Sequence, residues 1–222
     1  MPWIQIIGGV LLVGILFWWF RSYGHGDKSK TSIQIPNISG KTEVNSGISL
    51  PLSFNQPEGA VFSYAGWFLV NDYTYNYGVK RRIFSKGDCP GLYIDSTSNS
   101  LLVAIQTYGA TETILISNIP AQKWVHVALT VNQYAVDISI NGVPRQHHTL
   151  TQLPNQNDSP VVMGGNGSEG WDGTLSGLVY YNRAISTAEI DALVAKVPPS
   201  PYPSPTNSTY FGLKWYTDGL SA

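Results

Sequence analysis

The sequence has little charge, one cysteine and no long run of charges of one sign. Lys, Arg, Asp and Glu make up 12% of its 222 residues, and the formal net charge is −1. Ordinary soluble domains carry about 25% of these residues. Without a basic patch the chain cannot neutralise a phosphate backbone, so no nucleic acid partner is expected. The lone Cys89 excludes an intrachain disulfide and any multi-cysteine metal site, and it is compatible with a reducing compartment.

Signatures of catalysis are also missing. No serine stands in a Gly-x-Ser-x-Gly turn. Glu189 and Asp191 are the only acidic residues two positions apart, and they fall in an expected helix, where a step of about 200° sends their side chains to opposite faces. His147 and His148 are neighbours in an expected strand, so they also point to opposite faces and cannot chelate one ion. We therefore predict that the chain is not an enzyme and has no zinc site.

Acidic residues in loops offer the remaining candidate metal ligands. Asp72, Asp88, Asp158 and Asp172 stand where a calcium ion could find oxygen ligands, but solvated turns of any β-sandwich contain such residues. We expect no cofactor, and the sequence does not support calcium.

The first residues form a long hydrophobic run. No charged residue occurs from Trp3 to Phe20, and a helix over these residues would be about 27 Å long, close to the thickness of a hydrocarbon core. The run ends in Trp18, Trp19 and Arg21, as a bilayer interface favours. We expect residues 1–21 to be a single transmembrane anchor. The alternative is a signal peptide cleaved near Ser22-Tyr23-Gly24.

Two opposing signals bear on the orientation of the expected single-pass membrane protein. Arg21, Lys28 and Lys30 follow the run, and positive residues favour the cytosolic side, so we expect the domain to face the cytosol. Four Asn-x-Ser/Thr sequons favour the extracellular alternative. They are Asn37, Asn157, Asn166 and Asn207.

The rest of the chain predicts an all-β domain. We expect a polar linker over residues 22–43, a two-sheet antiparallel jelly-roll sandwich over 44–197, and a Pro-rich strap with an aromatic end over 198–222. The aromatic run 210–216 is expected to dock on this domain or on a neighbour. Asn141-Gly142 predicts a type I′ hairpin turn, and Ser186 to Glu189 predicts the capping box of one short helix. Short alternating runs predict the strands, which are 48–54, 61–70, 82–86, 91–95, 101–107, 113–117, 124–131, 135–140, 161–164 and 173–181.

Several of these runs resemble the strands of laminin G-like domains in the concanavalin A-like superfamily. The similar segments are Phe62-Ser63-Tyr64-Ala65-Gly66-Trp67, Ile83-Phe84-Ser85-Lys86-Gly87, Trp124-Val125-His126-Val127-Ala128-Leu129, Ile138-Ser139-Ile140-Asn141-Gly142, Leu178-Val179-Tyr180-Tyr181-Asn182-Arg183-Ala184-Ile185-Ser186 and Glu189-Ile190. They cover roughly Val44 to Val194. The resemblance implies a concanavalin A-like sandwich with Trp67 and Trp124 between the sheets.

The same resemblance implies adhesion, glycan-binding or structural roles. Ser176-Gly177 stands where relatives often carry acidic residues, which weakens the implied calcium site. Relatives that hydrolyse polysaccharides carry a Glu-x-Asp-x-x-Glu strand, which this sequence lacks.

One loop is the candidate binding site. Tyr73, Tyr75 and Tyr77 alternate along it and, if it is extended, would form a row of phenol rings for a sugar or a protein partner. Arg81 and Arg82 could pair with carboxylates of that partner. The alternatives are a hairpin tip folded over its own core and solvated edge-strand charges.

The favoured function is a non-catalytic, membrane-anchored structural or interaction module. Its expected partners are the lipid bilayer and other structural proteins of an assembly, such as a minor capsid protein linking an internal membrane to the shell of a large virus. A membrane-displayed lectin that binds glycans is the alternative, and a polysaccharide hydrolase is a third, less favoured one.

Overall fold

The computed structural model describes residues 30–34, 37–56 and 59–198. The expected anchor over 1–21 and the segment 199–222 lie outside these residues. Among the helices in the described ranges, none has the length and hydrophobicity needed to cross a bilayer.

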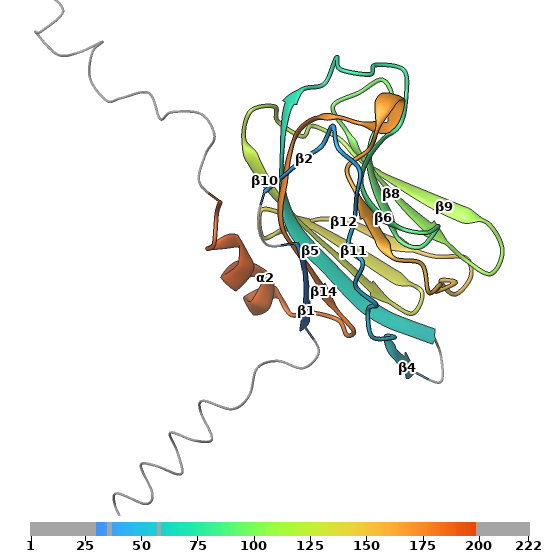
Figure 1. The fold of residues 1–222 in the computed structure, drawn as a ribbon. Helices are drawn as coiled ribbons and strands as arrows, with labels where there is room; N and C mark the ends of the chain where they lie inside the picture. The colour runs from blue at the N-terminus through green and yellow to red at the C-terminus, as the bar shows by residue number, and fades with distance from the viewer. Residues whose placement is uncertain (1–29, 35–36, 57–58, 199–222) are drawn as a thin grey trace, which may run out of the picture.

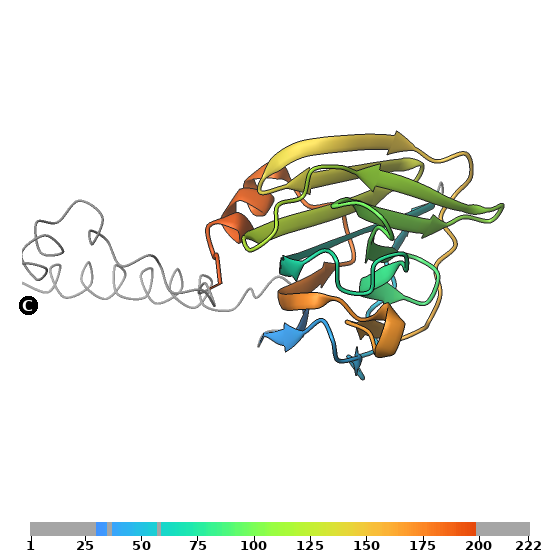
Figure 2. The same cartoon turned by 90° about the horizontal axis from the view of Figure 1, so that it is seen from above.

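Two antiparallel sheets face each other and form a sandwich (Figures 1 and 2). The eight-stranded sheet has the order β1-β14-β5-β10-β11-β12, with β2 also paired to β14 and β4 to β5. Its strands are β1 Lys30–Gln34, β2 Ile38–Ser39, β4 Phe54–Gln56, β5 Gly59–Asp72, β10 Trp124–Asn132, β11 Ala135–Ile140, β12 Val143–Thr149 and β14 Asp172–Tyr181. The all-β sandwich predicted from alternating runs is thereby confirmed.

The six-stranded sheet has the order β3-β13-β6-β7-β8-β9. Its strands are β3 Val44–Asn45, β6 Arg81–Lys86, β7 Gly91–Ile94, β8 Leu101–Gln106, β9 Thr111–Ile116 and β13 Val161–Met163. A short 3₁₀ helix, η1 Gly167–Glu169, precedes β14. The hairpin between β11 and β12 turns at Asn141 and Gly142, whose φ values of 51° and 84° confirm the predicted turn with two left-handed residues.

The long strand β5 shows how the pattern of the sequence separates the two faces of its sheet. Phe62, Tyr64 and Phe68 belong to the buried cluster between the sheets, whereas Ala65 belongs to a second cluster on the outer face. The ring of Tyr64 packs 5.3 Å from that of Phe84 on the opposite sheet, centroid to centroid. Because side chains of a strand alternate between its two faces, β5 contributes both to the core and to an apolar surface on the outer face.

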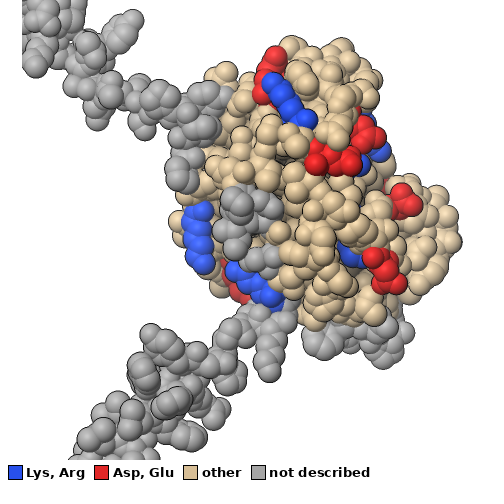
Figure 3. All heavy atoms as spheres, in the orientation of Figure 1, with Lys and Arg blue, Asp and Glu red and all other residues tan. Residues whose placement is uncertain are grey.

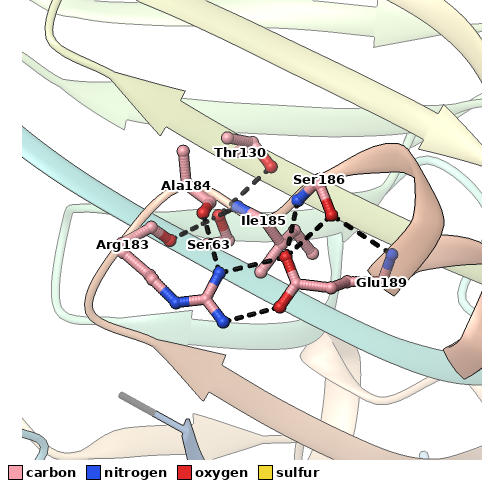
Figure 4. A network of polar contacts seen from close by, with 7 residues as sticks. All are labelled: Ser63, Thr130, Arg183, Ala184, Ile185, Ser186 and Glu189. Atoms are coloured by element: carbon pink, nitrogen blue, oxygen red, sulfur yellow. Dashed lines mark hydrogen bonds and ion pairs between the residues drawn. The ribbon is translucent and has the colours of Figure 1, made fainter. Parts of the chain in front are cut away.

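Helix α2, Thr187–Val194, covers this apolar surface on the outer face. Ile185 and Ile190 pack with Ala65, Ala128, Val179 and Tyr181 from three strands. The helix begins in a capping box, in which the Ser186 hydroxyl accepts from the Glu189 amide and the Glu189 carboxylate accepts from the Ser186 amide at 2.8 Å. Figure 4 shows this start with the Arg183 guanidinium reaching the same carboxylate at 2.6 Å. The predicted short helix and its cap are therefore confirmed.

We expect Glu189→Gln to lower stability only where the carboxylate is ionised. Hydrogen bonds from Arg183 and from the Ser186 amide lower the pKa of Glu189 from 4.5 to about 2. The ion pair therefore stabilises the fold above pH 4.5, and its contribution is lost as the pH falls toward about 2. The carboxylate is 36% exposed and partly screened by solvent, so we expect an effect of about 1 kcal/mol at neutral pH.

Denaturant unfolding of both proteins across this pH range measures the difference. If the difference in free energy of unfolding between wild type and Glu189→Gln stays constant from neutral to acidic pH, the stabilising role of the ionised Glu189 carboxylate is contradicted.

The structure corrects two of the segments predicted from the sequence. β1 and β2 lie within the predicted linker 22–43, because the alternation around Ile33 puts that side chain into the core while the strands pair with β14. The predicted strand 48–54 is wrong except for Phe54. Asn45 and Ser46 accept hydrogen bonds from Gly47 and Ile48 in local turns, which divert the chain before β4.

The core tryptophan is also not one of the two predicted. Trp67 and Trp124 follow the outward phase of β5 and β10, and the Trp67 ring meets His126 at 5.1 Å on the outer face. Trp171, which follows η1, is fully buried in the cluster between the sheets.

Candidate functional site

The tyrosine loop, residues 73–80, joins the two sheets at one end of the sandwich. It is a series of turns and not an extended segment, since Asn76 takes a φ of 52° and the Tyr77 amide donates to the Thr74 carbonyl at 3.1 Å. The predicted row of phenol rings on one face therefore does not form.

The three tyrosines lie in three different environments. Tyr73 packs against the core, and its hydroxyl is buried without a hydrogen-bond partner among the described residues. Burial raises its pKa strongly. The ring of Tyr75 is covered by Lys41, whose Nζ lies 4.6 Å from the ring centroid. Tyr77 is 63% exposed and is the tyrosine that a partner can reach.

Arg81 is hydrogen-bonded to the backbone of the tyrosine loop. Its side chain is buried, and its Nη1 donates to the carbonyl oxygens of Tyr73 at 2.6 Å and Tyr75 at 2.9 Å, while Nη2 donates to that of Asp95. Burial lowers the pKa of this guanidinium. The sequence suggested that Arg81 pairs with a carboxylate of a partner, but with an exposed fraction of 1% the side chain cannot reach one. For the same reason it is not a solvated edge charge. It is the residue that sets the shape of the loop.

Arg82 is engaged on the surface beside the loop. Its guanidinium forms ion pairs with Glu43 and with Glu169 at 3.1 Å, and its Nε donates to the Gly164 carbonyl at 2.9 Å. These contacts join β6 to the segments before β3 and β14. Arg82 therefore links loops within the domain.

Asn76 and Lys41 connect the tyrosine loop to the segments before β3 and β14. The Asn76 amide donates to the carbonyls of Gly167 at 2.7 Å and Gly170 at 2.9 Å, and Lys41 pairs with Asp172 at 3.2 Å. On the face shown in Figure 3, charges of opposite sign lie side by side and most of the surface is uncharged. The loop is thus a rigid support that presents Tyr77 together with Val79, which is 39% exposed. The sequence analysis did not identify Asn76 or Lys41 as site residues. Asn76 could have been found, because asparagine followed two positions later by Gly78 is typical of a turn.

The other residues considered as metal ligands or nucleophiles make contacts within the fold or are buried. His147 Nδ1 meets Asp137 at 2.7 Å and His148 Nε2 meets Glu112 at 2.8 Å, so the two rings point to different faces as predicted. Asp72 accepts from the Thr74 hydroxyl and amide, which lowers its pKa. Burial raises the pKa of Cys89 to about 12, which makes it a poor nucleophile. In the described part of the chain, no three His, Cys, Asp or Glu residues are grouped as metal ligands.

Residues 41–191 match the family model of the concanavalin A-like lectin/glucanases superfamily. The chain belongs to this superfamily. The match covers more than half of the chain and includes the six-stranded sheet, the eight-stranded sheet without β1 and β2, and the tyrosine loop. A comparison with curated proteins found no match.

Solved structures similar to this superfamily member include toxin binding domains. The binding domain of Paraclostridial Mosquitocidal Protein 1 aligns with a TM-score of 0.55 and 18% identity over 74% of this chain and 46% of that chain. The receptor binding domain of botulinum neurotoxin D aligns with a TM-score of 0.58 and 15% identity over 77% and 46%. A botulinum neurotoxin type C, which interacts with two ganglioside molecules, aligns with a TM-score of 0.52 and 18% identity over 66% and 37%. The chain thus spans less than half of each structure, and at these identities the similarity shows the fold alone.

Proposed function

We propose that the chain is a non-catalytic interaction module that binds a partner protein through the tyrosine loop. The braced loop carries this proposal. Its backbone is held by Arg81 and Asn76, so little conformational entropy is lost on binding. Tyr77 and Val79 then offer an aromatic and an aliphatic contact from a fixed support. The aligned toxin structures are themselves binding domains, which supports the class of function.

The proposal includes a membrane anchor over residues 1–21 and a cytosol-facing domain within a larger assembly, such as one that links a viral membrane to a capsid. The uncharged run from Trp3 to Phe20 and the cations that follow it support this placement. Intact mass and carbonate extraction of the protein from its native source test it. An intact N-terminus in the membrane fraction and unmodified sequons are expected, and a cleaved or glycosylated chain would contradict it.

Tyr77→Ala should weaken partner binding without affecting the fold. An exposed aromatic anchor commonly contributes more than tenfold to affinity, so we expect a loss of about tenfold or more. The full-length chain in detergent, with a photo-crosslinking residue at Val79, identifies the partner, and titration of that partner gives the affinity.

Tyr108→Ala is the matched control, since Tyr108 is 72% exposed and follows β8 at the opposite end of the sandwich. Equal affinity of Tyr77→Ala and Tyr108→Ala would refute the assignment of the loop.

Glycan binding by the same loop is a second candidate. An exposed tyrosine can stack on a sugar ring, and the aligned type C neurotoxin interacts with gangliosides. A glycan panel probed with wild type, Tyr77→Ala and Tyr108→Ala separates the two functions. Saccharide binding that is lost only in Tyr77→Ala would favour this candidate over a protein partner.

A further inference from the structure

One edge of the six-stranded sheet is open and regular. Strand β9 ends the strand order of this sheet and, in the part of the chain that the structure describes, pairs only with β8. Its register with β8 runs from Thr111 to Ile116 without a shift. Figure 1 shows β9 on the side of the sandwich opposite to α2. A further strand could continue the sheet at this edge.

The strands at the other three ends of the two sheets oppose such pairing. β1 and β12 each contain a register shift, β12 also contains Pro144, and β3 has only two residues. Bulges, prolines, lysines and short strands are common means of protecting an edge. β9 has no proline, glycine, lysine or arginine in its six residues. Among these four edges in the described ranges, it is the one without such protection.

β9 presents unpaired backbone groups at its open side. The Thr107 amide donates to the Ala110 carbonyl at 3.3 Å and closes the turn before β9. Because hydrogen-bonded pairs alternate along an antiparallel ladder, the N–H and C=O groups of Thr111, Thr113 and Leu115 point away from β8. These groups have no hydrogen-bond partner among the described residues. They are available for the hydrogen bonds of an added strand.

The side chains of β9 indicate what an added strand should carry. On the outer face Leu115, which is 51% exposed, lies opposite Leu102, and Leu102 lies opposite Tyr93, so an apolar row runs to the edge. The other face carries Glu112, whose carboxylate accepts from the Thr151 amide at 2.8 Å and stays 16% exposed. Apolar residues at alternate positions, with a cation at a position between them, would match both faces.

The C-terminal aromatic run has this pattern. In residues 210–216, Phe211, Leu213 and Trp215 stand at alternate positions, and Lys214, the one charged residue of the run, stands between two of them. A period of two is typical of a strand, and the seven residues of the run match the six of β9 in length. The Pro-rich segment before the run, residues 198–209, would span about 37 Å as an extended polyproline helix.

The C-terminal segment of a molecule begins far from the β9 of the same molecule. Helix α2, which precedes this segment, packs on the outer face of the eight-stranded sheet, whereas β9 belongs to the other sheet. The Pro-rich segment would have to cross the whole sandwich to reach it, but a neighbouring molecule can place its own β9 within about 37 Å of α2. A second copy of the chain is therefore the better partner for the run.

We propose that residues 210–216 of one copy of this chain pair with β9 of a second copy. The apolar side chains around Leu213 then extend the row of Leu115 and Leu102, and Lys214 lies on the same face as Glu112. Such pairing is head-to-tail and repeats from copy to copy, which suits a component of an assembly. The inference goes beyond the proposed function, since it uses β9 and not the tyrosine loop.

Disulfide trapping between two copies tests the pairing. Full-length chains with tags of different size are mixed in detergent and oxidised, one with Leu213→Cys and the other with cysteine at Thr111, Thr113 or Leu115 in turn. We expect one of the three positions to form a disulfide with Leu213→Cys, and that position gives the register. The native Cys89 is 2% exposed and does not compete. Gln146→Cys, at an exposed position of the edge strand β12, is the matched control and should form none.

Sedimentation of the full-length chain in detergent measures self-association. Thr113→Pro removes one outward N–H and leaves the ladder with β8 intact, so we expect association about tenfold weaker. Thr113→Lys should weaken association similarly, whereas Gln146→Lys adds the same charge to the other edge and should not. Unchanged melting temperatures of the variants establish that the fold is retained.

Four results would overturn the proposal. The first is the absence of any disulfide between the copies, and the second is a disulfide only within a chain that carries both Thr113→Cys and Leu213→Cys, which would place the run on its own domain. The third is a disulfide between two Thr113→Cys copies, which would show that β9 pairs with β9. The fourth is weaker self-association in Tyr77→Ala, which would place the contact on the tyrosine loop.

Discussion

Trp171→Ala should lower the free energy of unfolding by about 3–5 kcal/mol, the usual cost of deleting a buried tryptophan. The indole is fully buried and lies in the cluster between the sheets. A Cβ added at Gly40 or at Gly173 would collide with the ring, so these backbone segments lie directly against its surfaces. The strands and loops around it cannot collapse into the vacated volume, and we expect a cavity to remain.

Trp171→Phe is the matched control for this variant. The indole Nε1 has no hydrogen-bond partner among the described residues, so phenylalanine loses no hydrogen bond and only part of the volume. We expect it to cost about 1–2 kcal/mol. Urea unfolding of the three proteins measures both values. A loss below about 1 kcal/mol for Trp171→Ala would mean that the ring is not a part of the core.

Arg81→Met should destabilise the domain by about 3 kcal/mol or more, because it leaves three carbonyl oxygens without their donor. Two of these oxygens belong to Tyr73 and Tyr75 in the tyrosine loop, and the third belongs to Asp95 after β7. Methionine fills a similar volume but donates nothing, so the effect isolates the hydrogen bonds. The loop should also lose its fixed shape, and partner binding through Tyr77 should fall with it.

Arg81→Lys tests the geometry of the guanidinium. A single ammonium cannot reproduce the fork that serves three carbonyls on two segments, so we expect an intermediate loss of stability of about 1–2 kcal/mol. Denaturant unfolding gives the stability, and hydrogen exchange of the amides of Tyr77 and Gly78 reports on the loop. Both amides donate within the fold, to Thr74 and Ser96 respectively. Unchanged exchange in Arg81→Met would contradict the role assigned to Arg81.

Features that depend on neighbouring residues were predictable from the sequence. The alternation of β5, the Asn141-Gly142 turn and the capping box of α2 are each specified within a few residues, and the structure confirms them. The anchor over residues 1–21 stays a prediction, since it rests on a local run of uncharged residues outside the described part of the chain.

The candidate site depended on contacts between distant segments. Tyr73, Tyr75 and Tyr77 look equivalent in the sequence, but the first packs half-buried against the core, Lys41 covers the second and only the third is largely exposed. Arg81 looks like a surface charge, because nothing near it in the sequence shows that three carbonyl oxygens converge on it.

The sequence by itself therefore determined the class of fold, the superfamily resemblance and most strand positions, because strand periodicity, turns and caps are set by interactions over a few residues. Tertiary structure alone decided that Trp171 and not Trp67 fills the core, and that Arg81 holds the backbone of the tyrosine loop. It also decided that β9 lies at the edge of the six-stranded sheet. Those outcomes follow from how loops close between strands far apart in the chain, where burial and hydrogen-bond satisfaction outweigh local preference.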